Sequence, residues 1–145
     1  MASSSGQAGT PRAAAPYAVR FSDDRLRQVR RAVAGWAVQA GLRGQRAGDF
    51  VLAVHEIATN AVRHGSPVAR LVLQIVGGTA VQAEVRDGGQ WPPGPPAAPA
   101  PGRGGRGLQL VRRVCDEVTI RRGAGGSTVI LRMSLPGQDA ARSPG

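Results

Sequence analysis

Polar side chains recur at helical spacing in the otherwise apolar stretch VLAVHEIATNAVRHG, residues 51–65. Glu56, Asn60 and His64 are four residues apart, so an α-helix would place them on one face. A carboxylate and an amide oxygen one turn apart suit a hard cation, and Mg²⁺ is favoured because it keeps waters and shares itself with a phosphate group. Glu56 could instead act as a base that orients a hydroxyl or a water. A solvated polar helix face is the alternative to both.

A second candidate site is the segment Asp87-Gly88-Gly89 at the end of a predicted strand. The Asp87 carboxylate could accept a hydrogen bond from an exocyclic amine such as that of adenine. The glycines beside it would let the backbone approach a flat ring closely. A simple turn is the alternative, because Asp-Gly is a common turn dipeptide.

A third candidate is the glycine-rich segment GRGGRGL, residues 102–108, which leads into a predicted helix. The N-terminus of a helix presents free N–H groups and the positive end of its dipole to phosphates, and Arg103 and Arg106 add positive charge. No Gly-Lys-Ser/Thr follows, so this is not a Walker A loop. A flexible linker is the alternative.

Hydrophobic periodicity predicts the elements that must position these residues. Ser22 or Asp23 is expected to cap the first helix. The expected elements are a strand over 17–21, helices over 23–41 and 47–64, strands over 68–77 and 80–87, a long Gly/Pro-rich loop, a helix over 107–118, and strands over 117–122 and 127–135. This order predicts an α+β fold, a two-layer sandwich in which a mixed, mostly antiparallel sheet carries its helices on one face.

The composition limits the class of protein. The 145 residues predict one folded domain over 16–135, with a disordered tail over 1–15 and a loose tail over 136–145. No apolar run approaches a membrane span and no signal peptide is visible, so we expect a cytoplasmic protein. One cysteine and two histidines disfavour a disulfide, a thiolate metal site and a zinc site.

The net charge of +10 raises the question of a nucleic-acid partner. All basic residues are arginines, scattered along the chain in pairs at most, and only 3% of residues are aromatic. Compositional bias or a solvated surface explains this charge better than nucleic-acid binding, because no stacking platform for bases is visible. We expect neither a direct nucleic-acid partner nor a membrane partner.

The three motifs, in this order and spacing, resemble the histidine-kinase-like (Bergerat, GHKL) ATPases. HEIATNAVRHG is similar to their N box, RDGG to their first glycine box and GRGGRGL to their second. More narrowly, E-I-x-x-N-A-x-x-H-G with a C-terminal G-S-T-V resembles the bacterial anti-sigma factor serine/threonine-protein kinases. Those proteins phosphorylate an anti-sigma factor antagonist and thereby control a sigma factor.

The resemblance implies a Bergerat ATP-binding fold with ATP and Mg²⁺ as cofactors. It implies that Asn60 ligates the Mg²⁺ that bridges the ATP phosphates and that Glu56 is the base for the acceptor serine hydroxyl. Asp87 would bind the adenine amine with Gly89 beside the ring, and Ser127 or Thr128 would support the adenine pocket. The implied phosphate contacts, under a lid over about 88–106, are Arg103, Gly104, Gly105, Arg106, Gly107 and Leu108.

Two departures from the family pattern are visible: Trp91 stands where the first glycine box often has a second glycine, and the lid is rich in proline. His64 would lie near the phosphates or cap the helix. The resemblance implies a regulatory kinase with a sigma factor and an anti-sigma factor antagonist as protein partners. A non-catalytic ATP-dependent protein-binding module is the alternative, and homodimerisation stays open.

Overall fold

The computed structural model describes residues 14–89 and 104–137. Most of both predicted tails and most of the predicted lid therefore lie outside the described residues. The elements are β1 (Tyr17–Ser22), the 3₁₀ turn η1 (Asp23–Arg25), α2 (Leu26–Ala40), α3 (Gly44–Asn60), the π-helical turn η2 (Ala61–Gly65), β2 (Val68–Val76), β3 (Ala80–Asp87), α4 (Gly104–Val114), β4 (Glu117–Gly123) and β5 (Gly126–Ser134).

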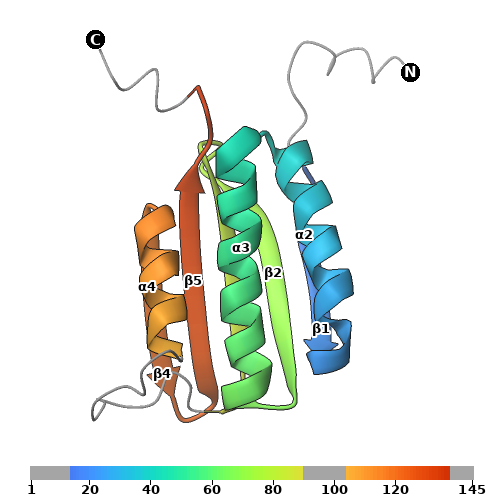
Figure 1. Ribbon diagram of the computed structural model, residues 1–145, viewed down its shortest axis with the longest axis vertical. Helices are drawn as coiled ribbons and strands as arrows, with labels where there is room; N and C mark the ends of the chain where they lie inside the picture. Colours follow the sequence, from blue (N-terminus) through green and yellow to red (C-terminus); the bar gives the residue numbers. More distant parts are fainter. Residues whose placement is uncertain (1–13, 90–103, 138–145) are drawn as a thin grey trace.

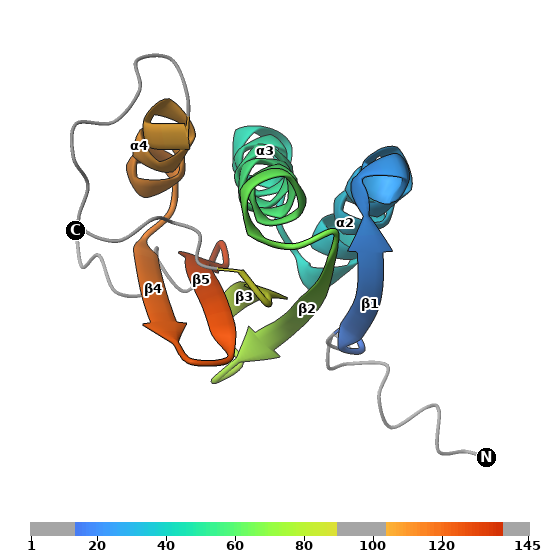
Figure 2. The ribbon, with the colours of Figure 1, turned by 90° about the horizontal axis from the view of Figure 1, so that it is seen from below.

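The strands form one five-stranded sheet in the order β1-β2-β3-β5-β4, and each of its neighbouring pairs is antiparallel. Helices α2, α3 and α4 lie side by side on one face of this sheet (Figures 1 and 2). The other face carries no helix in the part of the chain that the structure describes. The predicted two-layer α+β sandwich is confirmed, but its sheet is wholly antiparallel and not mixed.

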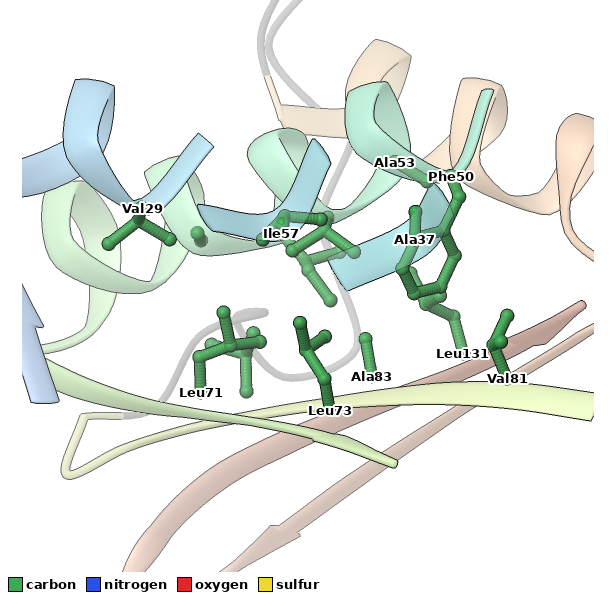
Figure 3. Close-up of a cluster of buried hydrophobic side chains, with 14 of the residues drawn as sticks. Val29, Ala37, Phe50, Ala53, Ile57, Leu71, Leu73, Val81, Ala83 and Leu131 are labelled. Atoms are coloured by element: carbon green, nitrogen blue, oxygen red, sulfur yellow. The ribbon is translucent and has the colours of Figure 1, made fainter. Parts of the chain in front are cut away.

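The core lies between the helices and the sheet because alternate strand residues point to the same face. Leu71, Leu73 and Ala83 are fully buried and point from the sheet toward Ile57 and Phe50 of α3 (Figure 3). The Phe50 ring also stacks on the ring of Trp36 from α2, with 6.2 Å between ring centroids. This packing fixes α3, which carries the first motif, against the middle of the sheet.

The N-terminus of the first helix differs from the prediction. Residues 23–25 form a 3₁₀ turn, and α2 begins only at Leu26. Neither η1 nor α2 has a side-chain cap. The Ser22 hydroxyl at the start of η1 donates its hydrogen bond to the Asp24 carboxylate, and the N-cap position of α2 is Arg25. Trp36 Nε1 donates a 2.8 Å hydrogen bond to the Ala15 carbonyl, which ties the chain before β1 to α2.

The other two helices begin earlier than predicted. Helix α3 begins at Gly44 rather than at 47 and includes residues predicted as loop. Helix α4 begins at Gly104 and ends at Val114, because the Asp116 N–H already donates to the Arg132 carbonyl beside β4. None of the helices in the described part of the chain has both the length and the apolar character that crossing a membrane requires.

Candidate functional site

The polar stripe of α3 faces the first turn of α4. Asn60 is 7% exposed, and its Nδ2 atom has no hydrogen-bond partner within the described residues. A Cβ atom added to Gly107 would lie 2.5 Å from Glu56 Oε1 and 3.5 Å from Asn60 Nδ2. The structure therefore brings Glu56, Asn60 and Gly107 together, and the absence of a side chain at 107 allows this close approach.

His64 does not continue this stripe. The helix changes at Ala61 into a π-turn, in which the Ser66 N–H donates to the Ala61 carbonyl five residues earlier. A π-turn holds more residues than an α-turn, so the spacing of four no longer keeps His64 above Asn60. The His64 side chain is exposed. The predicted row of three residues is thus a pair, and the third residue departs because of the π-turn.

The second glycine motif is helical in the structure. Gly104, Gly105, Arg106 and Gly107 form the first turn of α4, where the prediction placed a loop. The first N–H groups of a helix have no intrahelical acceptor, so they still point outward from this turn. Leu108 is half-buried and packs against the hydrophobic core. Arg103 and the side chain of Arg106 lie outside what the structure describes.

The carboxyl group of Asp87 sits at the end of β3 in a space that glycines leave open. A Cβ atom on Gly65 would lie within 2.7 Å of all three carboxyl atoms. A Cβ atom on Gly126, whose φ is +128°, would collide with the Asp87 carbonyl group. Gly65 has no positive φ, so its lack of a side chain serves the close approach and not the backbone conformation.

Asp87 is 8% exposed, and Gly89 N–H donates a 2.7 Å hydrogen bond to its Oδ1 atom. Burial raises the pKa of this carboxyl group above its ordinary value, and the Gly89 N–H offsets part of that rise. Within the described residues, Oδ2 has no hydrogen bond from a donor. The Asp87 carboxylate can therefore accept one more hydrogen bond, such as that of a ring amine.

The two hydroxyl candidates on β5 lie on opposite faces of the sheet. Ser127 is paired with Asp87 in the register, is 1% exposed, and its Oγ donates a 3.2 Å hydrogen bond to the Gly89 carbonyl. Thr128 is paired with Arg86 and points to the face without helices. Because side chains alternate along a strand, only Ser127 lies beside Asp87. The structure does not bring the predicted Thr128 to the site.

A groove of about 700 Å³ lies on the other side of Glu56, between α2, η1 and α3. Its charged and polar lining includes Arg27, Arg30, Arg31, Arg63, Asp23, Asp24, His55, Glu56 and Thr59. Thr59 Oγ1 is buried without a partner among the described residues. Burial lowers the pKa of His55, and Arg30 lowers it further. Glu56 thus lies between the first turn of α4 and a groove with several arginines.

Sequence reasoning missed the packing roles of Gly65, Ser66 and Gly126. Ser66 Oγ accepts a 3.0 Å hydrogen bond from the Gly88 N–H, which fixes the start of the predicted lid. The Gly65-Ser66-Pro67 segment reads as a helix stop, and Gly125-Gly126 reads as a hairpin turn. No local signal distinguishes a glycine that only ends a helix or forms a turn from a glycine that also makes room for a residue of a distant strand.

The solved structures that are similar to this chain include the following three. The RsbU and RsbW domains of Rv1364c from Mycobacterium tuberculosis share 27% sequence identity at a TM-score of 0.66, over 84% of this chain and 33% of that one. The chain therefore spans about a third of the length of that protein.

The other two structures show the fold alone. The Erythrobacter litoralis EL346 blue-light activated histidine kinase shares 23% identity at a TM-score of 0.56, over 81% of this chain and 42% of that one. Its histidine kinase domain shares 20% identity at a TM-score of 0.52, over 83% and 64%. A sequence model described as the histidine kinase-like ATPase domain matches residues 19–133, which include Glu56, Asn60, Asp87 and Gly107. The chain belongs to the histidine kinase-like ATPase domain family.

Proposed function

We propose that this protein is an ATP- and Mg²⁺-dependent regulatory kinase that phosphorylates a serine or threonine hydroxyl of a protein acceptor. The observation that carries this proposal is the position of Glu56. Its carboxylate touches the glycine-rich first turn of α4 on one side and lines the groove between α2 and α3 on the other. A phosphoryl donor and an acceptor hydroxyl approaching from these two sides would meet at Glu56.

Membership of an ATPase domain family implies ATP binding, and we place its base at Asp87. The free Oδ2 atom of Asp87 would accept the hydrogen bond of the adenine amine, and Gly89 would lie beside the ring. Ser127 supports this pocket through its hydrogen bond to the Gly89 carbonyl. The free N–H groups of Gly104 to Gly107 would bind the phosphates.

We include a magnesium ion beside Asn60 in this proposal. The buried Nδ2 atom of Asn60 lacks a partner within the described residues and, because it is a donor, would be satisfied by a phosphate oxygen, which leaves Oδ1 for the ion. Within residues 14–89 and 104–137, no three His, Cys, Asp or Glu side chains are placed to hold a metal together. The ion would therefore take most of its ligands from phosphate and water, as Mg²⁺ does, and would neutralise phosphate charge. Asn60 would contribute its amide oxygen.

The role of Glu56 in transfer follows from its two neighbours. As a carboxylate it would accept the hydrogen bond of the acceptor hydroxyl and orient that oxygen toward the γ-phosphorus. The P–O bond to the acceptor forms as the bond to ADP breaks, and the hydroxyl proton passes to Glu56. The arginines of the groove would hold the acceptor protein near Glu56 by pairing with its acidic groups.

We further propose that the acceptor is an anti-sigma factor antagonist and that the protein controls a sigma factor in the cytoplasm. The motif E-I-x-x-N-A-x-x-H-G and the 27% identity to the RsbU and RsbW domains support this regulatory class. Both partners would be proteins.

A second candidate is a module that binds ATP and a protein partner without phosphoryl transfer. The close contact between Gly107 and Glu56 favours it, because a γ-phosphoryl group would fit between them only after a movement. Transfer requires the Glu56 side chain or the first turn of α4 to move, whereas binding of ATP at Asp87 does not.

Radiolabelled ATP with Mg²⁺ and candidate antagonist proteins separates these functions. We expect Glu56→Gln to bind ATP like the wild type but to transfer at least about 100-fold less. Asn60→Ala should lose Mg-ATP affinity, and Asp49→Asn, which removes a carboxylate from α3 about two turns before Glu56, should change neither. Wild-type protein that binds ATP but labels no partner would leave only the binding module. Absence of ATP binding would overturn both functions.

A further inference from the structure

Four exposed arginines lie in one row across the face of the sheet that carries no helix. The strand register places Arg20 opposite Arg70 and Arg70 opposite Arg86. Arg86 lies opposite Thr128, which in turn lies opposite Arg121. We call Arg20, Arg70, Arg86 and Arg121 the arginine row. Of its four residues, only Arg86 belongs to one of the three family motifs, RDGG.

The arginine row is largely without counter-charge. Neighbouring strands lie about 4.8 Å apart, and like charges directly opposite one another destabilise a sheet. Arg86 pairs with Glu84 at 2.8 Å. For Arg20, Arg70 and Arg121, the described residues provide neither an ion pair nor a hydrogen bond to the side chain. The free protein therefore carries an unfavourable arrangement that a bound anionic partner would relieve.

The chain itself does not supply that partner. Of its nine acidic residues, Asp139 alone lies outside the described ranges, so no segment there could pair with the whole row. A second copy offers no free group of carboxylates either. The eight acidic residues within the described ranges pair with arginine, form hydrogen bonds with neighbouring side chains, or lie at the candidate functional site. They are Asp23, Asp24, Asp49, Glu56, Glu84, Asp87, Asp116 and Glu117.

The surroundings of the row indicate a protein partner rather than a nucleic acid. The next register row on the same face contains Ala18, Val72, Glu84, Ile130 and Thr119. Glu84 is the residue that pairs with Arg86, and Val72 and Ile130 on either side of it are half-buried. The aromatic residues of β1, Tyr17 and Phe21, point to the opposite face and could not stack on bases. Carboxylates beside apolar side chains would match charge and surface together, whereas a phosphate backbone would match charge alone.

We propose that this open face binds an acidic segment of another protein, with carboxylates on Arg20, Arg70 and Arg121 and apolar side chains on Val72 and Ile130. The surface lies on the opposite face of the sheet from Asp87 and Ser127, because Arg86 precedes Asp87 on β3 and Thr128 follows Ser127 on β5. It is separate from the groove beside Glu56, and its existence does not depend on phosphoryl transfer.

The test measures binding of a fluorescein-labelled synthetic peptide, in which glutamate alternates with leucine and alanine, to the full chain by anisotropy. The variant Arg20→Gln/Arg70→Gln/Arg121→Gln removes three charges from the row. The matched control Arg43→Gln/Arg112→Gln/Arg113→Gln removes three exposed charges elsewhere. We expect the row variant to bind about tenfold more weakly and the control to bind nearly like the wild type. The row variant should unfold at no lower temperature, because it loses like-charge pairs.

Three results would overturn the proposal. Equal weakening in both variants would mean attraction by net charge without a specific surface. The row would be a nucleic-acid surface if a labelled single-stranded oligonucleotide binds more tightly than the peptide and the row variant loses this binding. If the wild type sediments as a dimer and the row variant as a monomer, the face binds a second copy of this chain.

Discussion

Replacement of Gly65 by alanine tests whether close packing of the helix end on Asp87 positions the carboxylate that we propose binds the nucleotide. The new methyl group would lie within 2.7 Å of all three carboxyl atoms of Asp87, so one side must move by about 1 Å. If the carboxylate moves, its hydrogen bond from the Gly89 N–H is lost, which costs about 1.5–3 kcal/mol. If the backbone moves instead, the overpacking costs about 1–3 kcal/mol.

Together the two routes predict that Gly65→Ala lowers the free energy of unfolding by about 1–3 kcal/mol, which corresponds to a melting temperature lower by roughly 3–10 °C. Affinity for ATP should fall as well, because Asp87 no longer presents its free oxygen. Gly35→Ala is the matched control. A Cβ atom at Gly35 on α2 meets nothing within 4 Å, so this change should stabilise the protein by about 0.5–1 kcal/mol.

Calorimetry gives the two melting temperatures, and isothermal titration with ATP gives the affinities. The reasoning is refuted if Gly65→Ala melts with or above Gly35→Ala and binds ATP like the wild type. Loss of stability with unchanged ATP affinity would separate the packing from the pocket and would contradict the role assigned to Asp87.

The remaining predictions concern Asp87, Gly107 and Cys115. Because burial raises the pKa of Asp87, the stability that its protonated form contributes is fully present below the unfolded pKa of 3.8 and is lost as pH rises through the folded pKa. At neutral pH, Asp87→Asn should therefore melt at a higher temperature than the wild type and bind ATP more weakly. It should also lose less stability between acidic and neutral pH, and a melting temperature that depends on pH as in the wild type would contradict this. Gly107→Ala should displace the flexible end of Glu56, so phosphoryl transfer should fall at least about tenfold. The melting temperature should stay the same or rise slightly. A fully active variant would refute the contact between Gly107 and Glu56. Burial raises the pKa of the Cys115 thiol to about 12, so iodoacetamide at mildly alkaline pH should label it only after unfolding in urea; rapid labelling of the native protein would show that the thiol is accessible.

The sequence predicted the element order and the fold class because hydrophobic periodicity is local. Alternation in residues 68–87 and the stripe of α2 indicate strands and a helix without knowledge of their partners. The three motifs are likewise local patterns that depend only on neighbouring residues: the spacing of Glu56 and Asn60, the Asp-Gly-Gly at a strand end, and the glycines before a helix. The boundaries of α3 and α4 were predicted less well, since glycines that break a helix in isolation are tolerated where tertiary packing holds the helix.

Only the tertiary structure decided which of these residues meet. The π-turn removes His64 from the stripe, and strand register places Ser127 beside Asp87 while it turns Thr128 to the other face. The contacts of Gly65 with Asp87 and of Gly107 with Glu56 join elements that are distant in sequence. The arginine row likewise arises from four separate strands, so residues that look scattered along the chain form one surface. Local patterns determine secondary structure, whereas proximity across strands and helices depends on register and packing.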